Sequence, residues 1–130
     1  MLNTSVISVL RTFSKEELKE FDKFIVSPFF NSQPSLTRFY EELKKHYPDF
    51  DEKKIERKKI FSSIYPGKDY SDDTIRRLTS DLKKLMDNYM YVKVQDSNPV
   101  EARFLRSFEF SRRGLHKEAE KELEQIIKII

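Results

Sequence analysis

The chain has 130 residues, of which 36% are charged, 13% are aromatic and none is cysteine, and its formal net charge is +3. The lack of cysteine excludes disulfides and thiolate metal sites, and no apolar run approaches the ~20 residues of a membrane span. The N-terminus lacks the basic start and cleavage site of a signal peptide. We therefore expect a cytoplasmic protein with one compact core, built from long helices because only two residues are glycine.

The first half of the chain predicts three helices separated by capping and proline signals. A short apolar helix covers residues 4–13. Ser14 and Glu17 have the spacing of a capping box and begin a second helix, which Pro28 ends. The third helix begins at Pro34, which suits the first turn of a helix. It carries an apolar stripe at helical spacing that Pro48 closes: Leu36, Phe39, Tyr40, Leu43 and Tyr47.

The loop between the second and third helices holds two adjacent phenylalanines, Phe29 and Phe30. Adjacent aromatic residues are unusual in a loop. We expect one or both of them to fill the core between the helices, with an exposed partner-binding site as the alternative.

The chain is organised around residues 71–91. Apolar residues recur there at helical period: Ile75, Leu78, Leu82, Leu85, Met86 and Tyr89. Ser71 is the expected N-cap, and the helix would be roughly 30 Å long at ~1.5 Å per residue. A basic fourth helix is predicted before it, over 51–65, with Asp51 as its cap. The β-branched and aromatic residues of 89–94 are compatible with either the frayed end of this helix or a short strand.

A boundary is predicted between residues 1–95, an N-terminal helical bundle, and 96–130, a helical hairpin packed on it. Asn98 and Pro99 have the order of an N-cap and first helical residue, and Gly114 separates the last two helices. The fold class is therefore all-α, a multi-helix bundle of about seven helices.

The C-terminal hairpin has a spacing similar to that of a tetratricopeptide repeat. Four residues match the aromatic, turn glycine, small and large apolar positions of that repeat: Phe110, Gly114, Ala119 and Leu123. Arg103 and Arg106 depart from the repeat pattern, because they stand where it prefers an aromatic residue and a leucine. One such hairpin cannot bury its apolar face alone, so we expect it either to pack on the bundle or to begin a longer helical array.

Four segments together resemble a known family: residues 13–21 (FSKEELKEF), 27–31 (SPFFN), 60–70 and 78–82 (LTSDL). This combination is similar to the N-terminal segment of uncharacterised helical proteins of the Bacteroidota, over roughly residues 10–115. The resemblance implies a chain that continues into further helices. It implies no activity and lends no site residues.

The sequence indicates no catalytic, cofactor-binding or metal-binding residues. The two histidines, His46 and His116, lack acidic or histidine partners at metal-site spacing. Two isolated glycines cannot form a phosphate loop, and the carboxylates mostly alternate with lysines, as in solvated ion pairs. We therefore expect a protein that is not an enzyme and has no cofactor.

Two functions stay open. The first is a protein-interaction or scaffold module, in which a protein partner or a second copy binds exposed apolar residues: Phe29, Phe30, Ile126, Ile127 and Ile130. The second is a winged-helix-like nucleic-acid-binding domain that uses helix 71–90 and a wing near 91–94, because the basic excess lies within 51–94, with 11 basic and 8 acidic residues. Its contacts would be Lys58, Arg76, Arg77, Lys83 and Lys84, although aspartates of the same helix oppose phosphate.

Overall fold

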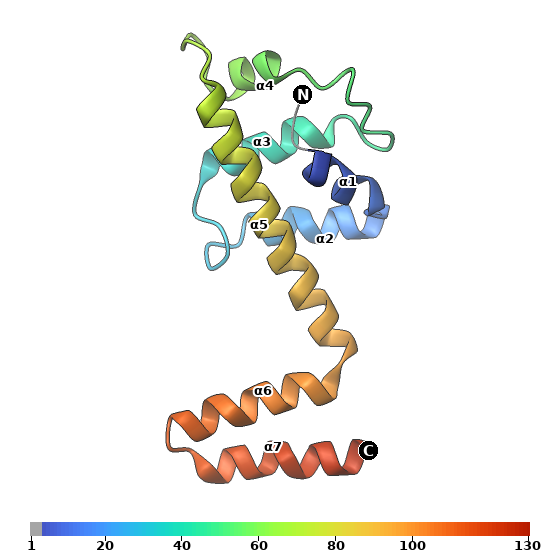
Figure 1. Cartoon of the computed structure of the whole chain (residues 1–130), viewed down its shortest axis with the longest axis vertical. Coiled ribbons are helices and arrows are strands. Elements are labelled where there is room, and N and C mark those ends of the chain that lie inside the picture. Colours follow the sequence, from blue (N-terminus) through green and yellow to red (C-terminus); the bar gives the residue numbers. More distant parts are fainter. Residues whose placement is uncertain (1–3) are drawn as a thin grey trace. The chain divides into compact units, whose positions relative to one another are not determined.

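The computed structural model describes residues 4–130, and in this range it contains seven helices and no strand (Figure 1). The predicted all-α, multi-helix fold is confirmed. The chain divides into two compact units, Met1–Tyr89 and Met90–Ile130, so the division falls within a helix. The helices are α1 (Thr4–Thr12), α2 (Lys15–Ile25), α3 (Pro34–Lys44), α4 (Arg57–Ile64), α5 (Asp72–Ser97), α6 (Pro99–Arg112) and α7 (His116–Ile129).

In the first unit, the N-terminal part of α5 supplies one side of the core. The apolar stripe predicted for this helix is buried as expected: Ile75, Leu78, Leu82, Leu85, Met86 and Tyr89. Aromatic side chains of α2 and α3 meet the end of this stripe, where the ring of Phe21 lies 5.5 Å from that of Tyr89 and 5.0 Å from that of Tyr40. The stripe at period 3.6 therefore does face the core.

Three helix starts follow the predicted caps. Ser14 and Glu17 form the complete capping box of α2, each side chain bonding the other residue's backbone N–H. The Ser71 hydroxyl accepts from the Thr74 N–H at 3.3 Å, and the Asn98 side chain accepts from the Glu101 N–H at 3.2 Å. These bonds satisfy backbone donors that the first helical turn leaves unpaired.

The predicted helix over 51–65 is wrong in its first turns, because α4 begins only at Arg57. The Asp51 side chain accepts from the Lys53 N–H at 3.0 Å, and the Asp51 carbonyl accepts from the Lys54 N–H at 2.9 Å. This local turn competes with helix formation, as short acidic side chains commonly do. Ile55 is nevertheless buried, so the segment still contributes to the core.

Two other boundaries differ from the prediction. The third helix ends at Lys44, and Tyr47, which was expected in its apolar stripe, is 37% exposed. The fifth helix runs on to Ser97, so residues 91–94 are helical and the predicted boundary at 95/96 falls within α5. The β-propensity of these residues does not prevent helix here, since such propensity is weaker than context.

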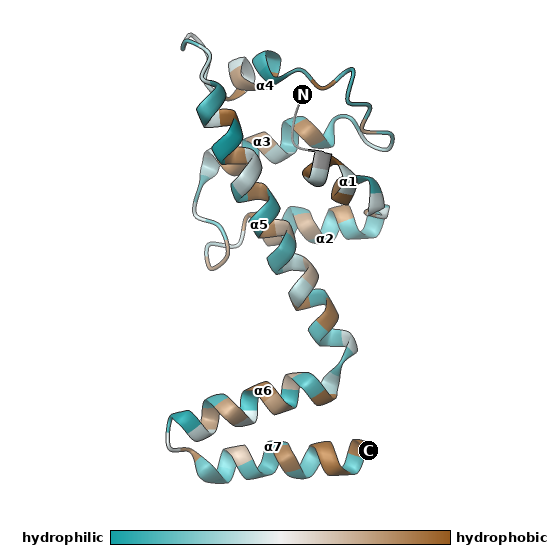
Figure 2. Cartoon of the chain, viewed as in Figure 1, coloured by the Kyte–Doolittle hydropathy of each residue, from teal (hydrophilic) through white to brown (hydrophobic). Residues whose placement is uncertain are grey.

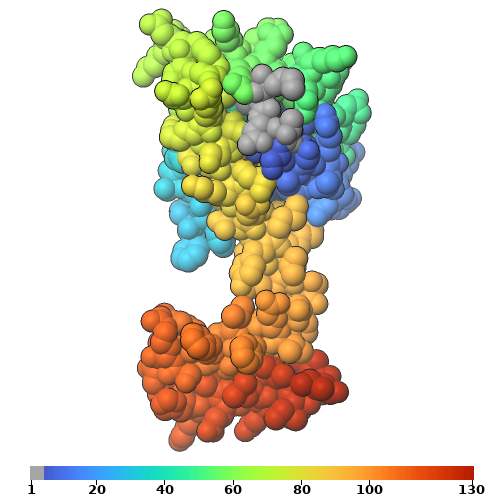
Figure 3. Space-filling view, in the orientation of Figure 1, coloured from blue at the N-terminus to red at the C-terminus, as the bar shows by residue number. Residues whose placement is uncertain are grey.

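The loop that follows α2 is organised by Asn31. Its side-chain amide donates to the Ile25 carbonyl at 2.8 Å and to the Thr37 hydroxyl at 3.3 Å, while its oxygen accepts from the Gln33 N–H at 3.0 Å. The loop therefore joins the end of α2 to the start of α3 through one side chain. In the space-filling view its light-blue atoms lie at the surface (Figure 3).

Replacing Asn31 with alanine should destabilise the first unit by about 1–2 kcal/mol, because partly buried backbone groups lose their partner. Urea unfolding followed by circular dichroism measures this change. Alanine at the exposed neighbour Ser32 is the control and should leave the midpoint unchanged. An equal effect of the two substitutions would contradict this role for Asn31.

In the second unit, α6 and α7 form an antiparallel hairpin (Figure 1). Gly114 has a φ of +79°, which glycine adopts without strain, and the Leu115 N–H donates to the Phe110 carbonyl at 2.8 Å. The buried side chains of this unit are few, namely Ser107, Ala119 and Ile126. The hairpin therefore has a thin core of its own.

Candidate functional site

Two surfaces stand out, one in each unit. The first is a groove of about 450 Å³ along α5, which we call the basic groove. Its floor includes the buried residues Ile75 and Thr79, and four cationic side chains line it. The remaining lining residues are Arg57, Arg76, Ser80, Lys83 and Lys84. Residues of α5 spaced by three and four share one face of the helix, which explains why these side chains meet.

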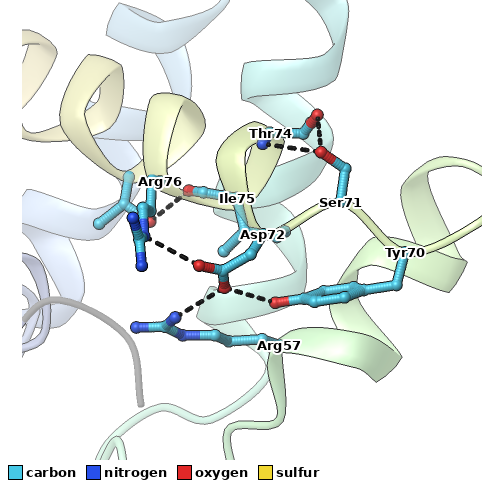
Figure 4. A network of polar contacts seen from close by, with 8 residues as sticks. Arg57, Tyr70, Ser71, Asp72, Thr74, Ile75 and Arg76 are labelled. Carbon is cyan, nitrogen blue, oxygen red and sulfur yellow. Dashed lines mark hydrogen bonds and ion pairs between the residues drawn. The ribbon is translucent and has the colours of Figure 1, made fainter.

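A polar network at one end of the basic groove is centred on Asp72 (Figure 4). The Asp72 carboxylate accepts from Arg57 Nη1 and from the Tyr70 hydroxyl, both at 2.9 Å, and forms an ion pair with Arg76 Nε at 2.9 Å. The hydrogen bond from Tyr70, followed by the hydrogen bond from Arg57 and the charge of Arg76, lowers the pKa of Asp72 below its usual value. Asp72 therefore stays ionised and holds two arginines at this end of the groove.

The charge of the basic groove is only partly neutralised. Lys83 forms an ion pair with Asp87 at 2.6 Å, whereas Lys84 has no ion-pair partner within residues 4–130. The Nε of Arg57 is buried and lacks an acceptor in the described part of the chain. Four cations thus face two carboxylates, Asp72 and Asp87, and an unused donor remains.

The structure brings together only some of the basic residues that the sequence indicates. Arg76, Lys83 and Lys84 line the groove, but Arg77 instead bonds Gln33 at 2.7 Å and Asp81 at 3.4 Å. Lys58 lies over the Tyr70 ring, 5.9 Å from its centroid. Arg57 was missed as a groove residue, since only the tertiary structure brings this first residue of α4 to Asp72 at the start of α5.

The predicted wing is wrong, because residues 91–94 are helical and residues 4–130 contain no strand. A winged helix also requires its recognition helix to present one basic face. Here the α5 cations are interleaved with the aspartates that pair with them, and Arg77 lies outside the groove. The observed site is therefore a local groove.

The second surface lies on the hairpin. Large apolar side chains remain exposed on both helices, including Phe108, which is 67% exposed, and Ile127, which is 72% exposed. Short hydrophobic and hydrophilic segments follow one another along the ribbons of α6 and α7 (Figure 2). We call the following set the apolar face: Phe104, Phe108, Leu123, Ile127 and Ile130.

Helix geometry places these residues on one side of the hairpin. Phe104 and Phe108 are four residues apart on α6, and Leu123 and Ile127 have the same spacing on α7. The residues that meet the other helix include Ser107 on α6 and Ala119 on α7. Viewed along each helix axis from its N-terminus, the exposed row is rotated away from these residues in the same direction on both helices. Since the helices are antiparallel, rows displaced in the same sense open on the same side.

The residues predicted for partner binding fall in different places. Ile126 is buried inside the hairpin and is therefore not available to a partner, while Ile127 and Ile130 are exposed. Phe30 stacks on Phe24 with ring centroids 4.3 Å apart, and Phe29 is 89% exposed and touches Phe30. Phe104 and Phe108 were missed, although their spacing is visible in the sequence.

Within residues 4–130, no group of three or more histidine, cysteine or acidic residues could hold a metal ion, and no helix is long and apolar enough to cross a membrane. Comparisons with protein-family models, curated proteins and solved structures give no match.

Proposed function

We propose that this chain is a non-catalytic, cytoplasmic protein-interaction or scaffold module, and that the apolar face of the α6–α7 hairpin is its binding surface. The supporting observation is that the hairpin exposes more large apolar side chains than it buries. Contiguous exposed apolar residues on a helical pair mark an interaction site or an association hazard. The tetratricopeptide-like spacing supports the same proposal, because such hairpins bury this face against a neighbour.

The partner most directly tested is a second copy of the chain. An apolar face is chemically complementary to itself, so two hairpins can pack without matching charges. Phe108 and Ile127 are the expected contributors of most binding energy, because they are the most exposed large side chains of the apolar face within α6 and α7.

Sedimentation velocity over a wide concentration range tests this proposal. We expect the wild type to associate, and the pair Phe108→Lys and Ile127→Lys to weaken association by about tenfold or more. Val26→Lys/Val94→Lys is the matched control, because both side chains are exposed, both lie outside the hairpin, and the pair gains the same two charges. Phe29→Lys tests the loop separately.

Association that is the same in the hairpin variants as in the wild type would exclude the apolar face. A wild type that stays monomeric at every concentration would exclude self-association. In that case the proposal that a second copy covers the apolar face is wrong. The circular dichroism spectra of the variants must match that of the wild type, because a variant that unfolds would also lose association.

Nucleic-acid binding, the alternative function, has weaker support. Three of the five candidate contacts share the basic groove, which favours it: Arg76, Lys83 and Lys84. Asp72 and Asp87 pair with two of these residues and would oppose a long polyanion passing along α5.

A further inference from the structure

We propose that the basic groove binds the phosphate group of a small phosphate monoester, such as a nucleoside monophosphate or a sugar phosphate. This site lies on α4 and α5 in the first unit and is independent of the apolar face. It has no part in the interaction function proposed above.

Charge matching is the first argument. Arg57, Arg76, Lys83 and Lys84 give four positive charges, and Asp72 and Asp87 offset two of them. The remaining two match a phosphate monoester, which carries about −1.5 to −2 at neutral pH. A phosphodiester of a nucleic acid carries only one negative charge at each position.

The donors are the second argument. Asp72 occupies Arg57 through Nη1 and Arg76 through Nε, which leaves other guanidinium N–H groups of both residues available. The Ser80 hydroxyl and the Lys84 ammonium also line the groove. A guanidinium group can donate two parallel hydrogen bonds to two oxygens of one phosphate. Because one carboxylate holds both arginines in place, their free N–H groups are preorganised to bind a phosphate.

The size and the floor of the groove are the third argument. A volume of about 450 Å³ lies within the range of small-molecule sites, and the buried Ile75 and Thr79 supply an apolar contact for the rest of the ligand. The flanking Asp72 and Asp87 disfavour a strand of nucleic acid, which would have to pass both carboxylates.

Titration of the full chain with adenosine monophosphate, followed by amide NMR shifts, tests the proposal. We expect saturable shifts in residues 75–84, and a loss of affinity of about tenfold or more in Arg76→Gln/Lys84→Gln. The control Arg77→Gln/Lys59→Gln removes the same charges outside the groove and should bind within about twofold of the wild type. Inorganic phosphate should compete, because the phosphate group carries the recognition.

Three results would overturn the proposal. The first is the absence of saturable shifts at millimolar ligand. The second is an equal loss of affinity in the control variant, which would indicate nonspecific attraction. The third is tighter binding of a single-stranded oligonucleotide, with affinity that falls steeply with salt, which would assign the groove to nucleic acid instead.

Discussion

Phe21→Ala is expected to lower the free energy of unfolding of the first unit by about 3–5 kcal/mol, the cost of removing a fully buried aromatic ring. Phe21 has no exposed surface, and its ring meets four others at centroid distances of 5.0 to 6.1 Å. Those rings belong to Phe13, Phe24, Tyr40 and Tyr89. The substitution therefore removes both the buried area and the edge-to-face contacts at the centre of the cluster.

Urea unfolding monitored by far-ultraviolet circular dichroism measures this loss. Phe29→Ala is the matched control, since it deletes the same ring from a side chain that is 89% exposed, and we expect a change within about 0.5 kcal/mol. Similar effects of the two substitutions would show that the aromatic cluster does not hold the first unit together.

Glu122→Gln is expected to destabilise the hairpin by about 1–3 kcal/mol, because it removes charge-assisted bonds that join α7 to α6. The Glu122 carboxylate receives Arg106 Nε at 3.2 Å and Nη2 at 3.1 Å, and Arg103 Nη1 at 3.2 Å. Its side chain is only 16% exposed. With so few buried apolar residues, the hairpin depends strongly on this contact.

The same contact predicts a pH dependence. Hydrogen bonds from Arg106, and then the charges of both arginines, lower the pKa of Glu122 in the folded chain. Because the pKa is lower in the folded chain, the ionised Glu122 stabilises the hairpin at pH values above its unfolded-state pKa of about 4.3. This stabilisation is lost as the pH falls through the pKa of Glu122 in the folded chain. Hydrogen exchange of the α6 and α7 amides, corrected for intrinsic rates, should show lower protection in acid.

Glu109 provides the control for this prediction. Arg112 and Arg113 lower its pKa to about 2, but all three residues lie at the exposed end of α6 and its C-cap. Glu109→Gln should therefore leave the protection of α7 almost unchanged, since local surface pairs contribute little. If Glu109→Gln and Glu122→Gln reduced the protection of the α7 amides equally, the contacts of Glu122 between α6 and α7 would not be the cause of the lost protection.

The sequence by itself determined most of the local structure. Apolar residues at period 3.6 identified the buried face of α5, and the capping box at Ser14 and the glycine at Gly114 placed two element boundaries. These signals act within a few residues along the chain, so no tertiary contact is needed to interpret them. The start of α4 was misplaced because the Asp51 turn satisfies the same backbone groups that a helix would use.

Only the tertiary structure decided which side chains share a surface. Arg57, the first residue of α4, joins Arg76 because both contact Asp72 at the start of α5, whereas Arg77, one residue further on, bonds Gln33 and Asp81. Ile126 is buried and Ile127 exposed for the same reason, since adjacent helical residues point about 100° apart and only one meets α6. Composition and spacing give the supply of charged and apolar groups, but the helix crossings determine where they gather.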